Sequence, residues 1–259
     1  MPTRKKQKAT APKAHAVAPP PERKHHTPPW KRTYLGTMSS TVHSVSSWLE
    51  LMEEGRIRIP EFQRPWVWTD EQVRRFLESI VRGYHVGNLL LWRRNEAPAW
   101  EGNLGEMRVC SPELSALHGS YLVVDGQQRL GALATASVAE RFKFDLRDGS
   151  VHVEERDVPW LVPFSLLMTT KGMLRIVDGA GAEHAARHGL DPDEVKDYLC
   201  EAMALVSGSW ALSAVEIPER WELSRVMESF RRINTEGTPM DPDMLRAALE
   251  RATAREADR

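Results

Sequence analysis

The spacing of apolar residues predicts helices and strands in alternation along most of the chain. Apolar positions three and four residues apart predict helices around residues 45–52, 73–81, 127–139, 195–206, 223–230 and 244–254. Short apolar or alternating runs predict strands at residues 56–59, 89–92, 121–124, 142–146 and 210–217. The stretch 93–120 is rich in Gly, Pro, Asn and charge, and it is expected to be an insertion or a long loop.

Local start signals strengthen several of these helices. Thr69 and Gln72 have the spacing of a capping box, and Asp191-Pro192 and Asp241-Pro242 place a capping aspartate before a proline at the first helical position. Alternating strands and helices predict a mixed α/β, or α+β, body. We expect a small sheet flanked by helices, with a helical C-terminal part.

Composition separates a basic N-terminal arm, residues 1–32, from an acidic body, residues 33–259. The arm holds nine Lys or Arg residues and one acid, a net charge of +8, whereas the whole chain carries −1, which leaves −9 for the body. Seven of the 17 prolines lie in the arm, which has almost no large apolar residues before Trp30, so we expect it to be disordered. Such an arm can contact DNA phosphates, or it can serve only as a solubilising tail.

Composition also limits the compartment. No run of about 18 apolar residues occurs, so no transmembrane helix is expected. No apolar segment of a secretory signal follows the basic start. The two cysteines, Cys110 and Cys200, are too few for a disulfide framework or a cysteine-rich zinc module, and a cytoplasmic location is expected.

Common catalytic motifs, such as a phosphate-binding P-loop, GxGxxG, HExxH and GxSxG, do not occur, but three polar segments are candidates for chemistry. In the first, Ile59–Trp68, aromatic residues and prolines surround Gln63 and Arg64, and the Arg64 guanidinium can bind a phosphate. The alternative is that Phe62, Trp66 and Trp68 anchor the core and that Arg64 forms a surface pair.

The second segment, Val123–Leu130, reads as a strand, an Asp125-Gly126 turn and a helix start. The free N–H groups and the positive dipole end of a helix attract anions there. The positive charge of Arg129 in the first turn opposes that dipole. The placement becomes favourable when an anion lies between the guanidinium and the helix N-terminus, because both attract it. Asp125 can hold a divalent cation, and Gln127 and Gln128 can orient a water or a phosphate oxygen. The alternative is a helix capped by Asp125, with both glutamines in solvent.

The third segment is Phe230–Met240, in which a helix ends in Asn and Gly and a Thr-Pro turn follows. Such residues are ordinary at helix C-termini. Asn234 can also offer its amide to a base or a phosphate.

Together the three segments resemble the N-terminal domain family of GmrSD-type modification-dependent restriction enzymes, which is similar to the ParB/sulfiredoxin fold. The family pattern IPxFQRxYxW, DGQQR and FxxINxxGTxL is matched in order by residues 59–68, 125–129 and 230–240, and Gly87 with the strand to Trp92 also matches. The chain departs from the family at Trp66, where Tyr is commoner, and at Gly131-Ala132, where Thr-Thr is common.

The resemblance implies binding of a nucleoside triphosphate with Mg²⁺, hydrolysis in some members, and a role in defence against foreign DNA. It implies that Asp125, Gln127, Gln128 and Arg129 are catalytic, with Asp125 at the metal. Gln63, Arg64, Gly126 and Asn234 would complete the nucleotide site. DNA-cutting members continue into an HNH nuclease domain, and none is expected in residues 33–259, so a separate HNH-type subunit is the implied partner. The alternatives are a non-catalytic DNA-binding adaptor and a ParB-like nuclease.

Overall fold

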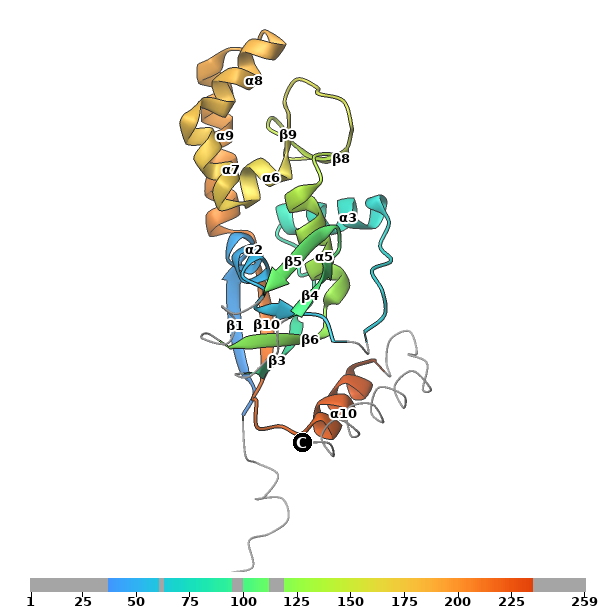
Figure 1. Cartoon of the computed structure of the whole chain (residues 1–259). Coiled ribbons are helices and arrows are strands. Elements are labelled where there is room, and N and C mark those ends of the chain that lie inside the picture. Colours follow the sequence, from blue (N-terminus) through green and yellow to red (C-terminus); the bar gives the residue numbers. More distant parts are fainter. Residues whose placement is uncertain (1–36, 61–62, 95–99, 112–118, 235–259) are drawn as a thin grey trace, which may run out of the picture. The chain divides into compact units, whose positions relative to one another are not determined.

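A computed structural model describes residues 37–60, 63–94, 100–111 and 119–234. The arm and the helix expected at 244–254 lie outside these residues. The mixed α/β class is confirmed (Figure 1). Within the described residues, no helix is both long and apolar enough to span a bilayer.

The main sheet has five strands in the order β1-β10-β3-β6-β2. Its strands are β1 (Ser39–Ser44), β2 (Ile57–Arg58), β3 (Leu89–Arg94), β6 (Ser120–Asp125) and β10 (Ala211–Ile217). Strands β10 and β3 pair in parallel, as do β2 and β6, whereas β1 with β10 and β3 with β6 are antiparallel. The sheet is therefore mixed, and β1 is a strand that the sequence pattern missed.

Helices cover both faces of this sheet, and β3 shows the alternation that this requires. Leu89 and Leu91 belong to the larger apolar core, with helices α2 (Val45–Glu53), α3 (Asp70–Val81) and α5 (Gln127–Val138). Leu90 and Trp92 belong to a smaller core on the other face, against α10 (Leu223–Asn234). A continuous apolar run such as residues 89–92 is what a strand buried on both faces requires.

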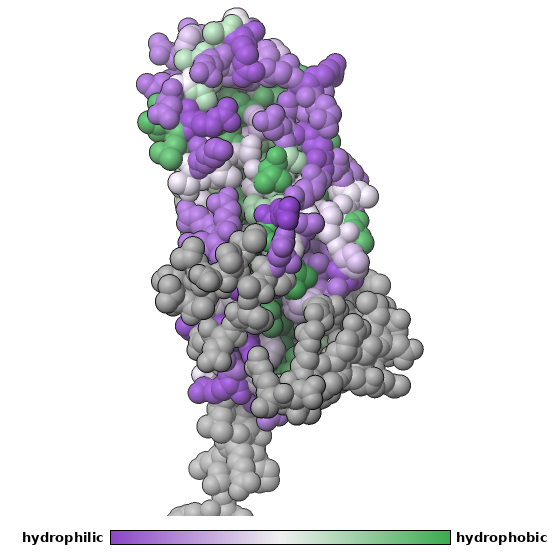
Figure 2. Space-filling view, viewed as in Figure 1, coloured by the Kyte–Doolittle hydropathy of each residue, from purple (hydrophilic) through white to green (hydrophobic). Residues whose placement is uncertain are grey.

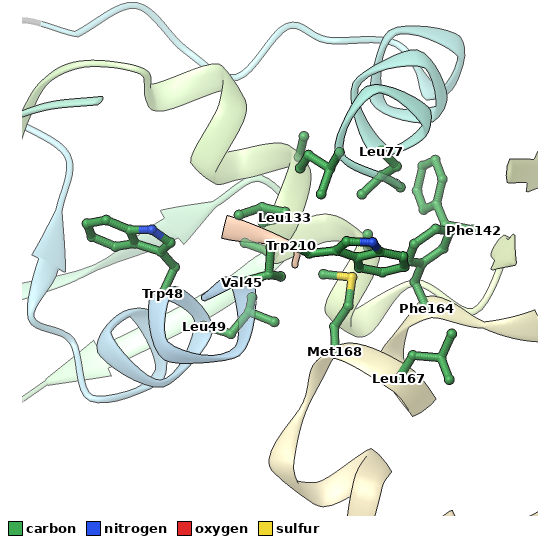
Figure 3. Close-up of a cluster of buried hydrophobic side chains, with 14 of the residues drawn as sticks. Val45, Trp48, Leu49, Leu77, Leu133, Phe142, Phe164, Leu167, Met168 and Trp210 are labelled. Atoms are coloured by element: carbon green, nitrogen blue, oxygen red, sulfur yellow. The ribbon is translucent and has the colours of Figure 1, made fainter. Parts of the chain in front are cut away.

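The rest of the larger core joins a second, three-stranded antiparallel sheet, β8-β7-β9 (Val151–Val153, Phe142–Asp145, Leu161–Pro163), to a helical region. That region comprises α6 (Phe164–Met168), α7 (Thr170–Arg175), the π-helical segment Ile176–Ala180, α8 (Gly181–His188) and α9 (Pro192–Gly208). Figure 3 shows side chains of α2, α5, α6 and β7 meeting around Trp210. On the face drawn in Figure 2, hydrophilic residues cover most of the described surface.

Two of the three predicted helix starts are confirmed, and the third, Asp241-Pro242, lies outside the described residues. The Thr69 side chain accepts from the Gln72 backbone N–H and the Gln72 side chain accepts from the Thr69 N–H, which completes the capping box. Asp191 caps α9 ahead of Pro192. These caps depend on neighbouring residues alone, which is why the sequence revealed them.

Of the two alternatives for residues 93–120, an insertion or a long loop, the long loop is wrong for the part that the structure describes, residues 93–94, 100–111 and 119–120. Strand β3 continues to Arg94, and β4 (Trp100–Leu104) and β5 (Met107–Ser111) form an antiparallel hairpin. Leu104, Met107 and Val109 are buried in the larger core, and the hairpin packs on α5. Tertiary burial therefore stabilises strands whose composition is that of a loop.

Candidate functional site at the β6–α5 turn

The predicted strand, turn and helix start are all present at the end of β6. Val123 and Val124 are fully buried, and Gly126 has a φ of 99°. A side chain at Gly126 would bring its Cβ within 2.4 Å of the Leu89 Cδ2, so the turn requires glycine for both its conformation and its space. Helix α5 starts directly after it, and no side chain among the described residues caps it, so the alternative of a cap by Asp125 is wrong. Its first-turn N–H groups therefore remain available to a ligand or to water.

Arg129 is bound to the protein itself. Its Nη1 donates to the carbonyls of Val86 at 3.2 Å and Asn88 at 2.9 Å, and its Nη2 donates to the Asp125 Oδ2 at 2.7 Å. Its side chain is 16% exposed and that of Asp125 33%. The two carbonyls and the carboxylate offset the unfavourable helix dipole without an added anion. The position of Arg129 in the first turn therefore does not by itself indicate a ligand.

The loop that accepts the hydrogen bonds of Arg129 has a glycine, Gly87, at the point of closest approach. Gly87 has a φ of 80°, and a Cβ there would lie 2.7 Å from the Arg129 Nη1. The register of β3 against β6 shifts between Leu90 and Leu91, and Leu90 pairs with Asp125. A register shift of this kind changes the direction of the side chains at the strand end. Sequence reasoning quoted Gly87 but missed the carbonyls on either side of it.

Gln63 and Gln128 connect the first and second candidate segments. The Gln63 Nε2 donates to the carbonyls of Val123 at 3.1 Å and Val124 at 2.8 Å. The Gln128 Nε2 donates to the Pro65 carbonyl at 3.1 Å, and its Oε1 accepts from the Val67 N–H at 3.1 Å. Gln128 is buried, so the alternative of a solvent-exposed pair is wrong for it. The two amides hold residues 63–67 beside the turn, because each satisfies backbone groups of the loop or the strand.

The remaining predicted residues differ in their surroundings. The Gln127 Oε1 is buried and, within the described part of the chain, has no hydrogen-bond partner. Arg64 is exposed and forms no ion pair with any described residue. Asn234 is the last residue of α10, and its side chain lies outside the description. The structure thus brings Gln63, Arg64 and residues 125–129 to one region.

Trp66 and Gly131, at which the chain departs from the family pattern, lie next to each other. A Cβ on Gly131 would be 2.6 Å from the Trp66 ring, so the absence of a side chain at 131 makes room for the larger ring at 66. Ala132 is fully buried in the core. The positions that often carry Thr are therefore packing positions here, and the loss of two hydroxyls removes no exposed ligand of the turn. Trp66 and Trp68 pack against the larger core, as the structural alternative expected, whereas Phe62 lies outside the described residues and the surface pair expected for Arg64 is not formed with any described residue.

The fold and the turn define a mixed α/β domain with a candidate anion site at a helix N-terminus. The sequence pattern described as "GmrSD restriction endonuclease, N-terminal domain" matches residues 45–249. The chain belongs to this family.

A relative among curated proteins is an uncharacterized protein of Methanocaldococcus jannaschii. It is 28% identical over 105 residues, which are 39% of this chain and 18% of the relative. The chain thus matches less than a fifth of that relative's length.

Proposed function

We propose that the β6–α5 turn binds the phosphates of a nucleoside triphosphate and that the domain hydrolyses it while acting with a separate HNH-type nuclease. The observation that carries this proposal is the first turn of α5. It has no side-chain cap, and its Gln127 Oε1 is a buried acceptor without a described partner. The N–H groups of the first turn can donate to an anion, and the Gln127 Oε1 beside them can accept from a water or bind a cation that accompanies the anion.

Each residue has a defined part in this proposal. The N–H groups of the first turn would donate to phosphate oxygens, and exposed Arg64 would add a charged donor. Arg129 has five N–H groups, and it donates three hydrogen bonds to described atoms. It would therefore position Asp125 and also reach a phosphate with a remaining N–H group. Gln63 and Gln128 would keep the wall of the site in place. The Gln127 Oε1 would orient the attacking water.

The donor set near Asp125 fits a Mg²⁺ ion that arrives with the nucleotide. One Asp125 oxygen, Oδ2, accepts a hydrogen bond from Arg129, which leaves Oδ1. The Gln127 Oε1, two residues further along the chain, has no partner among the described residues. Mg²⁺ in nucleotide sites is held by one or two carboxylates, with phosphates and waters completing its shell. When bound, the ion would neutralise phosphate charge.

The test uses the full chain with each common nucleoside triphosphate and Mg²⁺, and it measures phosphate release and the melting temperature. The variant Asp125→Asn should abolish phosphate release. The matched control is Asp178→Asn, because Asp178 is exposed and lies in the π-helical segment rather than at the turn. Equal release by wild type and Asp125→Asn would contradict the hydrolytic role. Absence of any nucleotide-induced rise in melting temperature would contradict binding.

A second candidate, a non-catalytic adaptor, is favoured by a specific observation. Arg129, Gln63 and Gln128 all donate to backbone carbonyls of the protein, so these motif residues already serve the fold. In this case the domain would bind a nuclease subunit, and it would bind DNA through residues 1–32. Purified chain that shifts a DNA probe but neither binds nor hydrolyses nucleotides would support the adaptor. Plasmid nicking by the purified chain alone would instead support the ParB-like nuclease.

A further inference from the structure

Three potential metal ligands meet in a part of the chain that the proposed nucleotide site does not use. His184 and His188 lie four residues apart on α8, so both project from the same face of the helix. Asp157 comes from the loop between β8 and β9. One ligand atom from each of the three residues lies within 4.8 Å of the others. The two imidazole centroids are 4.6 Å apart.

His184 has an unusual environment for a structural histidine. It is only 6% exposed, and within the described residues its Nε2 is buried without a hydrogen-bond partner. Buried polar atoms are almost always paired, so an unpaired nitrogen on a histidine of this cluster points to a missing partner. Burial, together with the nearby His188, lowers the pKa of His184, and the neutral ring is the form that binds metals.

A purely structural explanation accounts for only two of the three residues. The His188 Nε2 lies 3.0 Å from the Asp157 Oδ1, and His188 is the last residue of α8. Arg187 donates to the other carboxylate oxygen, Oδ2, at 2.5 Å. These two contacts hold the carboxylate in position and give Asp157 and His188 partners. They give the His184 Nε2 none.

We propose that His184, His188 and Asp157 bind a divalent transition-metal ion of the Zn²⁺ class. Two imidazoles and one carboxylate are a common ligand set for Zn²⁺, and three protein ligands leave a fourth position to water. The ion would replace the contact between His188 and the Asp157 Oδ1 and would supply a partner for His184. Arg187, which stays on Oδ2, and Lys143 carry positive charge near His184 and act against the cation, so we expect binding weaker than at an all-cysteine site. This site is independent of the nucleotide proposal.

The experiment uses tag-free, full-length protein, because a histidine tag would bind the same ions. Titration with Co²⁺ should produce the visible absorption of a tetrahedral site, and Zn²⁺ should remove that absorption. Calorimetry with Zn²⁺ should give one ion per chain. The matched control replaces His25 and His26 together by Ala, since this adjacent pair also offers two imidazoles but supplies none of the three proposed ligands.

His188→Ala and Asp157→Asn should each weaken Zn²⁺ binding by at least about tenfold and lose the Co²⁺ spectrum, whereas the His25/His26 control should keep both. His184→Ala should remove the rise in melting temperature that Zn²⁺ produces. Because His184 is buried, that variant can fail to fold, and the two more accessible ligands then decide the result. The proposal is overturned if no tetrahedral Co²⁺ spectrum appears, or if His188→Ala and Asp157→Asn bind Zn²⁺ as tightly as wild type.

Discussion

Replacement of Arg129 separates two physical arguments that give opposite signs. Considered with its helix alone, Arg129→Glu should stabilise the protein by up to about 1 kcal/mol, because an acid in the first turn complements the dipole. In the folded chain, the same change would place a carboxylate beside Asp125 and against the carbonyls of Val86 and Asn88. We expect Arg129→Glu to be strongly destabilising, and more so than Arg129→Ala.

The magnitude follows from the bonds lost. Hydrogen bonds to a charged group contribute roughly 1.5–3 kcal/mol each, but they do not add, and a carboxylate that is one-third exposed is screened by solvent. Arg129→Ala removes three such bonds and leaves two carbonyls without this donor. We therefore expect a loss of about 2–4 kcal/mol in the free energy of unfolding. For a domain of this size, that lowers the melting temperature by roughly 5–15 °C.

Urea unfolding and thermal melts of the nucleotide-free protein measure this effect. Arg64→Ala is the matched control, because Arg64 is exposed beside the same turn, and its change should stay within about 0.5 kcal/mol. Gly87→Ala should reproduce part of the loss, since its Cβ would displace the Arg129 Nη1. A melting temperature of Arg129→Glu at or above that of wild type would refute the network and restore the dipole argument.

Four further predictions concern other parts of the chain. Gly131→Thr should cost about 1–3 kcal/mol by overpacking against Trp66, and adding Trp66→Tyr should recover most of it in a double-mutant cycle; simple additivity would refute the contact. Gln128→Ala should speed hydrogen exchange at the Val67 amide, whose acceptor it removes, and unchanged protection would count against the link. Burial lowers the pKa of His184 in the folded state. In the presence of a chelator, its contribution to the unfolding free energy should therefore be complete above pH about 6.5. That contribution should fall below this pH, because His184 takes up a proton more readily in the unfolded chain. His184→Gln should flatten that decline, and an unchanged slope would contradict it. Deletion of residues 1–32 should weaken DNA binding in low salt and leave nucleotide binding intact; equal DNA affinity would disprove the electrostatic role of the arm.

The sequence by itself determined the elements whose signals are local. Apolar spacing, the Thr69–Gln72 capping box and the Asp191-Pro192 start need only neighbouring residues, and they predicted α2, α3, α5 and α9 close to their observed positions. The strand, glycine turn and helix around residues 123–130 were predicted for the same reason. The hairpin β4–β5 was missed, because its apolar residues become a strand face only when α5 lies beneath them.

The partners of the candidate side chains were decided by tertiary structure alone. Arg129 meets carbonyls 41 and 43 residues earlier in the chain, and Gln128 meets a loop 61 and 63 residues away. Asp157 reaches His188 across 31 residues. A sequence motif specifies which donors and acceptors exist, but which of them pair depends on how distant segments cross. That crossing is set by burial of the whole core, and this is why the structural partners of Arg129 could not be predicted from the motif that contains it.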